Sequence, residues 1–227
     1  MKCTIIPVVL FSVLALFLSC VQHKKGVQSS HIHYLALGDS YTIGQGVPTS
    51  SNWPNQLSER LQKTGHGTVQ TEIIARTGWT TGQLLNALPQ KKRDSYDLVS
   101  LSIGVNNQYR GQPFRVFEME FEELLQQAIT LAGSKHCVFV VSIPDYGVTP
   151  FGKRNSERIA MEIDKYNAHQ QKRCREEGVL FVDVTGISRE LGSGKEALAA
   201  DRLHPSGEQY TLWVEKMLPV VLGLMDR

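Results

Sequence analysis

Five short segments of the chain are almost continuously apolar and rich in β-branched residues, which is typical of strands that are covered on both faces. They lie at Ile32–Leu37, Val69–Ala75, Leu98–Ile103, Cys137–Ile143 and Val179–Val184. Elsewhere apolar residues recur three or four positions apart, a spacing that places them on one face of a helix. That spacing predicts helices over Asn55–Lys63, Gly82–Leu88, Phe117–Ala132, Ser156–Glu177 and Ser206–Leu224. Pro219 predicts a kink or an early end in the last helix.

Strands and helices alternate along the chain with short connections, and this alternation predicts a parallel sheet between two helical layers. The expected fold is therefore α/β, a three-layer α/β/α sandwich around a five-stranded parallel sheet. The sequence contains no internal repeat, and its amino-acid composition does not change along the chain after residue 30. We expect one domain over residues 31–227.

The first twenty residues differ from the rest of the chain. Ile5–Leu18 is apolar apart from one serine, and this run is too short for a spanning helix, so it predicts a secretory signal. Leu16–Cys20 resembles a bacterial lipobox, in which the signal is cut before the cysteine and Cys20 is acylated, although Phe17 stands where leucine is preferred. The alternative is an ordinary signal peptide that is cut nearby. Residues 21–30 then form a polar tether, and the prediction is an exported, periplasmic or cell-envelope lipoprotein.

The charge balance is ordinary, with 24 basic and 22 acidic residues and a formal net charge of +2. It gives no reason to expect a nucleic-acid partner. No CxxC motif and no cluster of cysteine and histidine exists in the sequence, so we expect no metal site and no cofactor. Cys137 and Cys174 form either a disulfide or two separate buried thiols, and the second alternative is favoured.

Glycine and polar, reactive residues follow each predicted strand, the last of them after a short connection. These segments are Gly38–Tyr41, Thr77–Trp79, Gly104–Asn107, Pro144–Gly147 and Asp201–Pro205. Each segment alone is typical of an ordinary turn or helix start. However, the carboxyl ends of parallel strands meet at one edge of a sheet, where ligands bind. We therefore expect the five segments to converge on one site.

Taken together, these segments are similar to the SGNH (GDSL) hydrolase superfamily over residues 33–224. Leu37–Gly44 resembles the block that carries the nucleophile, and Asp201–Pro205 resembles the terminal block. Trp53-Pro54 before a helix, and Asn106–Gly111, resemble most closely the periplasmic arylesterase, lysophospholipase and thioesterase branch. One position departs from the pattern, because Asn107 replaces the usual aspartate. The resemblance implies the sheet order 2-1-3-4-5.

A serine hydroxyl is a weak nucleophile at neutral pH and needs a base to accept its proton. His204 can act as that base for Ser40, and Asp201 lies three residues before His204, within reach of its other ring nitrogen. The resemblance implies three donors to the negative oxygen of the intermediate: the backbone N–H of Ser40, the backbone N–H of Gly78 and the side-chain amide of Asn106. Losing one such donor typically costs about 100- to 1,000-fold in rate.

Further residues of the same loops are candidates for the wall of a substrate pocket, and each is equally consistent with packing at its rim. They are Tyr41, Trp79, Asn107, Tyr109, Arg110, Asp145 and Tyr146. Arg110 would place a fixed cation beside the site, which suggests the hypothesis that the pocket favours an anionic or phosphate-bearing ester.

The predicted function is hydrolysis of carboxylic esters or thioesters through an acyl-Ser40 intermediate, with a small-molecule, lipid or glycan ester as substrate. A membrane is the only other expected partner, through the lipid anchor. Two alternatives stay open. One is deacetylation of a carbohydrate ester. The other is a non-catalytic lipoprotein that uses the same pocket to bind a ligand.

Overall fold

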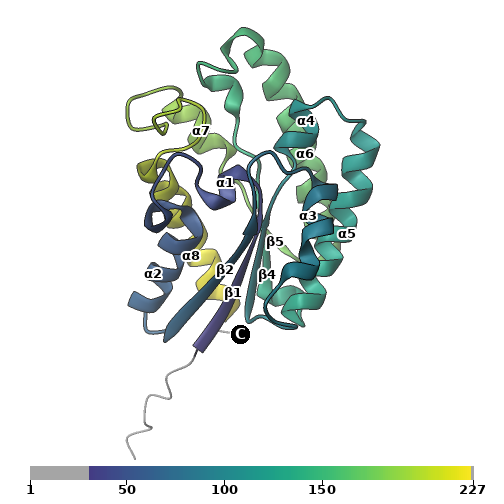
Figure 1. The fold of residues 1–227 in the computed structure, drawn as a ribbon, viewed down its shortest axis with the longest axis vertical. Helices are drawn as coiled ribbons and strands as arrows, with labels where there is room; N and C mark the ends of the chain where they lie inside the picture. Colours follow the sequence, from purple (N-terminus) through teal and green to yellow (C-terminus); the bar gives the residue numbers. More distant parts are fainter. Residues whose placement is uncertain (1–30, 226–227) are drawn as a thin grey trace, which may run out of the picture.

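The computed structural model describes residues 31–225, and a parallel sheet lies at its centre (Figure 1). Its strands are β1 (His31–Gly38), β2 (Thr68–Ala75), β3 (Leu98–Ser102), β4 (Val138–Val141) and β5 (Leu180–Val182). The strand order is β2-β1-β3-β4-β5, and every neighbouring pair is parallel. The predicted five-stranded sheet and its order are confirmed. The predictions for the signal, Cys20 and the tether lie outside the described residues.

The register of the sheet brings three strands to the same level at their carboxyl ends. Gly38, the last residue of β1, is paired with Ala75 of β2 on one side and with Ser102 of β3 on the other. All three residues end their strands. The loops that follow therefore leave the sheet side by side, as the convergence of sequence segments predicts.

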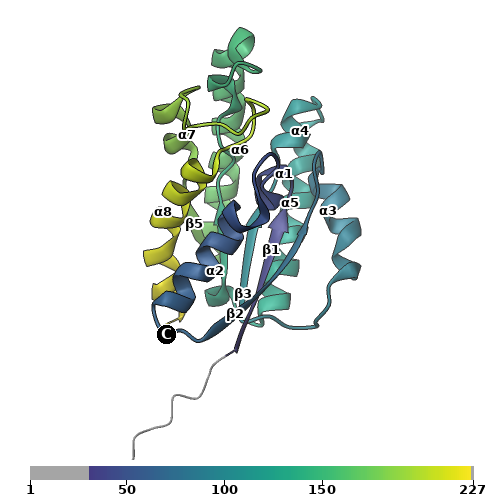
Figure 2. The same cartoon turned by 60° about the vertical axis from the view of Figure 1, so that its left-hand side comes forward.

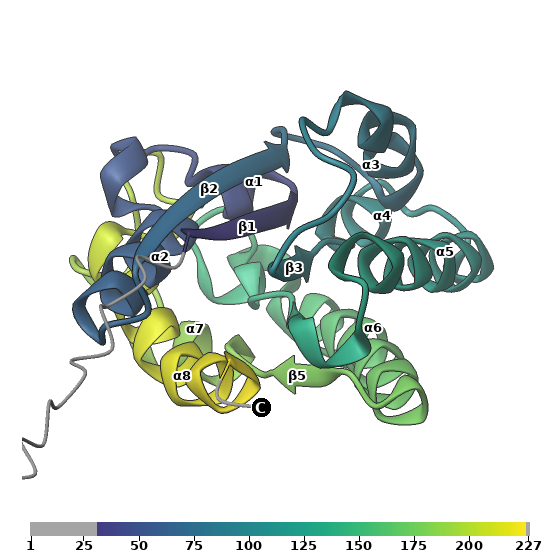
Figure 3. The ribbon, with the colours of Figure 1, turned by 90° about the horizontal axis from the view of Figure 1, so that it is seen from below.

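Helices cover both faces of the sheet (Figures 2 and 3). One face carries α2 (Trp53–Lys63), α7 (Thr185–Leu191) and α8 (Gly207–Met225), and the other carries α3 (Thr81–Ala87), α5 (Phe114–Ala132) and α6 (Ser156–Glu177). Two short helices, α1 (Ser40–Ile43) and α4 (Val105–Tyr109), lie at the carboxyl end of the sheet (Figure 1). This arrangement confirms the three-layer sandwich.

Large side chains fill the space between the layers. Trp53 of α2 and Phe139 of β4 are fully buried and meet edge to face, with ring centroids 6.5 Å apart. On the opposite face, Phe117 and Phe121 of α5 stack at 5.6 Å, again without solvent exposure. Burial of apolar surface on both faces fixes the sheet between the helices.

The ends of several elements differ from the sequence prediction. β4 begins one residue late because Lys135–Cys137 forms a 3₁₀ turn, and β5 has only three residues. Five short 3₁₀ turns occur in residues 31–225, the others being Thr49–Ser51, Leu88–Gln90, Tyr146–Val148 and Lys153–Asn155. α8 continues through Pro219 as far as Met225. Tertiary packing thus overrides the local preference of this proline for a helix end.

The two cysteines of the domain are both free in the structure. Cys174 is buried and Cys137 is half-buried. Of the two alternatives for these cysteines, a disulfide or two separate thiols, the structure has the second. Over the range 31–225, no helix is at once long enough and apolar enough to pass through a membrane.

Candidate active site

The turn after β1 requires a glycine. A Cβ atom on Gly38 would lie 2.0 Å from the hydroxyl oxygen of Thr42 and 2.5 Å from the carbonyl oxygen of Ser102. Real Cβ atoms do not approach other atoms so closely, so a side chain here would push α1 away from β3. Glycine therefore allows the first turn of α1 to fold directly against the strand ends, and this brings Ser40 to the edge of the sheet.

Asp39 caps α1 from a buried position. Its side-chain Oδ1 accepts the backbone N–H of Tyr41 at 3.0 Å, and only 1% of the residue is exposed. Burial raises the pKa of the Asp39 carboxyl to about 7, and the hydrogen bond from Tyr41 opposes that shift only in part. The capped turn holds Ser40 as the first residue of α1, where its backbone N–H is not used by the helix.

Ser40, His204 and Asp201 lie in series at the carboxyl edge of the sheet. The Ser40 Oγ is 2.9 Å from Nε2 of His204, and Nδ1 of the same ring is 2.6 Å from Oδ2 of Asp201. These residues are 164 positions apart at the first contact and three positions apart at the second. The fold therefore joins the serine to an acid–base pair that comes from a single loop.

That loop is held by its own backbone. Asp201 Oδ1 accepts the N–H groups of Leu203 and His204, both at 3.0 Å, so one carboxylate oxygen fixes the turn while the other holds the imidazole. Arg202 has φ +59°, and it is the only non-glycine residue with positive φ in the described part of the chain. A bulky residue in this region marks a constrained turn. The constraint brings the Asp201 carboxylate back over the amides that follow it.

The electrostatics of this pair favour an ionised Asp201. Burial alone would raise the pKa of its carboxyl, but the N–H groups of His204 and Leu203 and the His204 ring outweigh burial and hold the pKa below its usual value. An ionised Asp201 accepts a proton-bearing Nδ1, which leaves Nε2 of His204 free to accept the hydroxyl proton of Ser40.

The loop after β2 brings Gly78 to the same cavity as the serine. Gly78 has φ +81°, a conformation that glycine adopts without strain. Within residues 31–225, no acceptor takes the backbone N–H of Gly78 or that of Ser40. The side-chain amide of Asn106, at the start of α4, donates one hydrogen to the Trp79 carbonyl at 2.9 Å and has its second hydrogen to offer.

Asn107 ties this loop to α4. Its buried amide accepts the N–H of Thr81 at 3.1 Å and donates to the Thr81 hydroxyl at 2.6 Å and to Oε1 of Gln112 at 2.9 Å. A carboxylate at this position could accept but could not donate. The asparagine that departs from the family pattern thus supports a specific set of hydrogen bonds around the site.

Arg110 provides a second tie between α4 and the loop. Its guanidinium donates to the Gly78 carbonyl oxygen at 2.5 Å and to Oε1 of Gln83 at 3.3 Å. Gln83 in turn accepts the backbone N–H of Thr80 at the start of α3. The charged group of Arg110 is therefore engaged with the backbone of Gly78, a residue that lines the cavity at Ser40.

A cavity of about 240 Å³ opens above the serine. Ser40, Gly78, Asn106 and His204 line it, and so do three of the seven pocket candidates from the sequence: Tyr41, Tyr109 and Tyr146. The other four, Trp79, Asn107, Arg110 and Asp145, are not among the residues that line it. Five further lining residues are not among those candidates: Gln45, Thr77, Val105, Phe151 and Leu203. All but Phe151 lie in or beside the segments already singled out, so proximity to those segments is the signal for them.

Asp145 has a different set of contacts. Its buried carboxylate is 2.8 Å from Nε of Arg189, which also contacts Asp164, and its Oδ1 accepts the N–H of Gly147 at 2.8 Å. These bonds hold the loop that carries Tyr146.

Comparison with known proteins gives consistent results. The model of the GDSL-like lipase/acylhydrolase family matches residues 36–212. An arylesterase from Vibrio mimicus is 31% identical over 139 residues, which are 60% of this chain and 66%, slightly under two thirds, of the arylesterase. TesA has a similar structure, with a TM-score of 0.65, 22% identity and coverage of 85% of this chain and 99% of TesA. An acetyl xylan esterase from Geobacillus stearothermophilus has a TM-score of 0.66 at 17% identity, over 84% of this chain and 94% of that structure.

The fold and the sequence blocks at its carboxyl edge define a class, the SGNH hydrolases. Within that class, the chain belongs to the GDSL-like lipase/acylhydrolase family, whose model covers well over half of its 227 residues. The resemblance of the sequence segments is thereby confirmed.

The hydrogen bond from Arg110 to the Gly78 carbonyl predicts that Arg110 positions the loop after β2. We expect Arg110→Ala to lower kcat for a neutral ester on the order of tenfold with little change in KM, because a displaced donor costs less than the 100- to 1,000-fold loss of a removed one. Initial rates on a neutral and an anionic ester check this, with Arg115→Ala, an exposed arginine of α5, as control. A rise in KM for the anionic ester alone would instead support the substrate-attraction hypothesis.

The buried carboxyl of Asp39 makes stability depend on pH. Its pKa is 3.8 ordinarily and about 7 in the fold, so between these values the folded state holds a proton that the unfolded state has lost. Stability therefore falls as pH rises through this window. Asp39→Asn keeps a side-chain oxygen but does not titrate, so its stability relative to wild type increases from pH 4 to pH 7. Urea unfolding at several pH values measures this, with the exposed Asp94→Asn as control. Parallel curves for Asp39→Asn and wild type would contradict the assignment.

Proposed function

We propose that this chain hydrolyses carboxylic esters through a covalent acyl-Ser40 intermediate, with His204 as acid and base and Asp201 as its partner. The observation that carries the proposal is the continuous series of two hydrogen bonds, of 2.9 and 2.6 Å, that links the Ser40 hydroxyl to the Asp201 carboxylate at the wall of a cavity. A serine, an imidazole and a carboxylate in this order form the arrangement that activates a hydroxyl for attack.

In the first half of the reaction, the Ser40 Oγ attacks the carbonyl carbon of the ester and its proton passes to Nε2 of His204. The carbonyl double bond opens, and its electron pair remains on the oxygen as a negative charge. Asp201 stabilises the imidazolium that forms. The intermediate then collapses, the bond to the leaving oxygen breaks, and His204 returns the proton to that oxygen. An alcohol leaves and the acyl group stays on Ser40.

Water completes the reaction by the same path. His204 removes a proton from a water molecule as its oxygen attacks the acyl carbon. The second tetrahedral intermediate collapses, the bond to the Ser40 Oγ breaks, and His204 returns the proton to that Oγ. A carboxylic acid leaves, and the serine hydroxyl is restored.

Three donors are assigned to the negative oxygen: the backbone N–H groups of Ser40 and Gly78 and the amide of Asn106. In support of this assignment, neither backbone N–H has an acceptor in residues 31–225, and all three residues line the cavity. Donors that are fixed before the reaction stabilise the developing charge without reorganisation. Arg110 and Asn106 hold the Gly78–Trp79 segment in place from α4.

For the substrate, we propose the arylesterase-like end of the family, with a thioester as an alternative acyl donor. The cavity at Ser40 is small and bordered by the rings of Tyr41, Tyr109 and Tyr146, which suits a short acyl or an aryl group. The arylesterase of Vibrio mimicus is the relative that supports this choice. The acetyl xylan esterase has the same fold, and at 17% identity it carries no argument about the substrate.

A labelling and hydrolysis experiment tests the mechanism. A fluorophosphonate probe is expected to label wild type and not Ser40→Ala, and 4-nitrophenyl acetate hydrolysis is expected to vanish in Ser40→Ala. Asn106→Ala should keep its labelling site but lose about 100- to 1,000-fold in kcat, because one donor to the oxyanion is missing. Wild type that neither labels nor hydrolyses any ester would support the non-catalytic binding lipoprotein instead.

We also propose that the protein is exported and anchored through a lipid on Cys20. The support is the apolar run Ile5–Leu18 followed by Ser19 and Cys20, all outside the described residues. Mass spectrometry of the mature N-terminus is expected to find an acylated Cys20, and Cys20→Ser should release the protein from the membrane fraction. An unmodified mature end at another residue would leave export by an ordinary signal peptide.

A further inference from the structure

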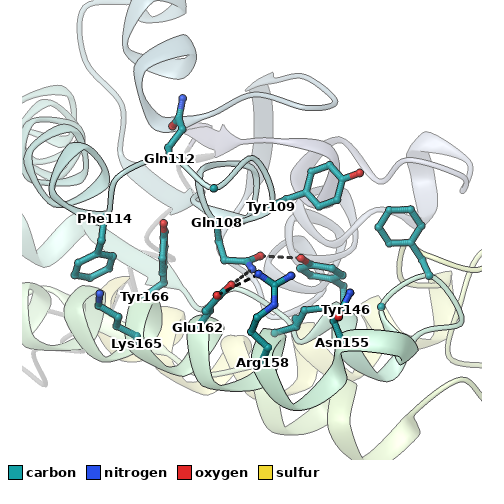
Figure 4. A pocket seen from close by; sticks show the side chains of 14 residues that line it. Gln108, Tyr109, Gln112, Phe114, Tyr146, Asn155, Arg158, Glu162, Lys165 and Tyr166 are labelled. Atoms are coloured by element: carbon teal, nitrogen blue, oxygen red, sulfur yellow. Dashed lines mark hydrogen bonds and ion pairs between the residues drawn. The ribbon is translucent and has the colours of Figure 1, made fainter.

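A second and larger cavity adjoins the one at Ser40. Its volume is about 480 Å³, against about 240 Å³ for the first, and the two share Tyr109, Tyr146 and Phe151 in their walls. Figure 4 shows this second cavity, which lies between α4 and the first half of α6. A molecule that is bound at Ser40 and extends into the second cavity therefore lies against these rings.

The shared rings differ in how firmly they are held. Tyr146 is 6% exposed, and its hydroxyl donates to Oε1 of Gln108 at 2.9 Å. Tyr109 and Phe151 are 58% and 55% exposed, with ring centroids 5.7 Å apart. Exposed side chains change rotamer on a fast timescale, whereas a buried and hydrogen-bonded ring does not. The boundary between the cavities thus has one fixed side and one side that can open.

The second cavity carries a net positive charge. Lys165 stands over the Phe114 ring, 3.9 Å from its centroid, and no carboxylate of residues 31–225 lies in ion-pair distance of its ammonium group. Arg158 is 3.6 Å from Oε1 of Glu162, whose Oε2 accepts from Gln108 at 2.5 Å. Two cations and one engaged carboxylate leave one positive charge without a partner.

Two further donors of this cavity have no protein acceptor. Within the range 31–225, no hydrogen bond engages the hydroxyl of Tyr166 or the side-chain amide of Asn155. Burial raises the pKa of Tyr166 to about 12, so its hydroxyl keeps its proton at neutral pH. Figure 4 shows Tyr166 beside Phe114 and Lys165, and Asn155 beside Arg158. The one carboxylate, Glu162, already has two donors, so the cavity offers more donors than acceptors.

We infer that the second cavity binds an anionic oxygen-bearing group, a phosphate or a carboxylate, at the far end of an ester whose reacting part lies at Ser40. This inference rests on the proposed function. Unpartnered cations and N–H or O–H donors recognise the oxygens of such a group through charge-assisted hydrogen bonds. The same cavity gives a neutral hydrocarbon end no comparable partner, because its donors would lose water without a replacement. Lys165 is the specificity residue, since its charge is not already paired.

Matched pairs of esters test the inference and identify which end of the substrate carries the charge. One pair is 4-nitrophenyl butyrate and the 4-nitrophenyl monoester of glutaric acid, which differ by a carboxylate on the acyl side. The other pair is a monoacylglycerol and the lysophosphatidate with the same acyl chain, which differ by a phosphate on the alcohol side. In Lys165→Gln, we expect kcat/KM to fall about fivefold to tenfold for the anionic member of one pair, through a higher KM, and to stay within about twofold for the neutral members.

Two variants control this experiment. Lys172→Gln removes an exposed charge from the same helix, seven residues away and paired with Glu176, and should change neither pair. Lys165→Arg keeps the charge and should retain most of the preference. The preference should also weaken with added salt. Equal losses on neutral and anionic members in Lys165→Gln, or no loss on either anionic ester, would overturn the inference.

A binding measurement separates this inference from the proposed function. Octyl phosphate contains no carboxylic ester, so its binding to Ser40→Ala is independent of hydrolysis. Calorimetry should give a Kd about fivefold to tenfold weaker when Lys165→Gln is added to Ser40→Ala. Binding that depends on Lys165 in a protein that hydrolyses no ester would refute the proposed function alone. The second site alone would be refuted if the wild type hydrolyses esters but octyl phosphate does not bind. The same holds if octyl phosphate binds with the same Kd with and without Lys165→Gln.

Discussion

The parallel register of β1 with β2 and β3 is the constraint on which the site depends. Because Gly38, Ala75 and Ser102 end their strands side by side, three loops leave the sheet at one point. The close packing at Gly38 then sets the start of α1 against the strand ends, with Ser40 at its first position. A shift of one residue in either pairing would separate the hydroxyl from the backbone donors of the neighbouring loop.

Side chains of α4 and of the residue that follows it hold the loop after β2 in place. Asn106 bonds to Trp79 in the loop after β2, Asn107 bonds to Thr81 at the start of α3, and Arg110 bonds to Gly78. A backbone hydrogen bond from Trp79 to Arg76 closes the loop, and these side chains fix it against a helix that follows a different strand. Preorganisation of this kind places polar groups before the substrate arrives.

The parallel sheet and the convergence of the reactive segments could be predicted from the sequence, because strand periodicity and the motifs at strand ends are local patterns. The sheet order followed only from the resemblance to a known family. The role of Arg110 could not be predicted, because it depends on the direction of the Gly78 carbonyl, which only the folded loop defines. The place of Lys165 and Arg158 in a cavity could not be predicted either, for a different reason. They lie in the first half of a long helix, where lysine and arginine are ordinary surface residues, and only the packing of α6 beside α4 gives them a cavity to face.

The loop from Asp201 to His204 pairs its carboxylate and imidazole locally, with the left-handed Arg202 between them. The contacts of this turn are local in sequence, whereas the Ser40 hydroxyl lies 164 positions away and joins it only in the completed sheet. A partly folded chain that has formed this turn therefore holds an imidazole and a carboxylate but no activated hydroxyl. Reactivity toward esters therefore requires the completed sheet, because no short stretch of the chain holds all three groups.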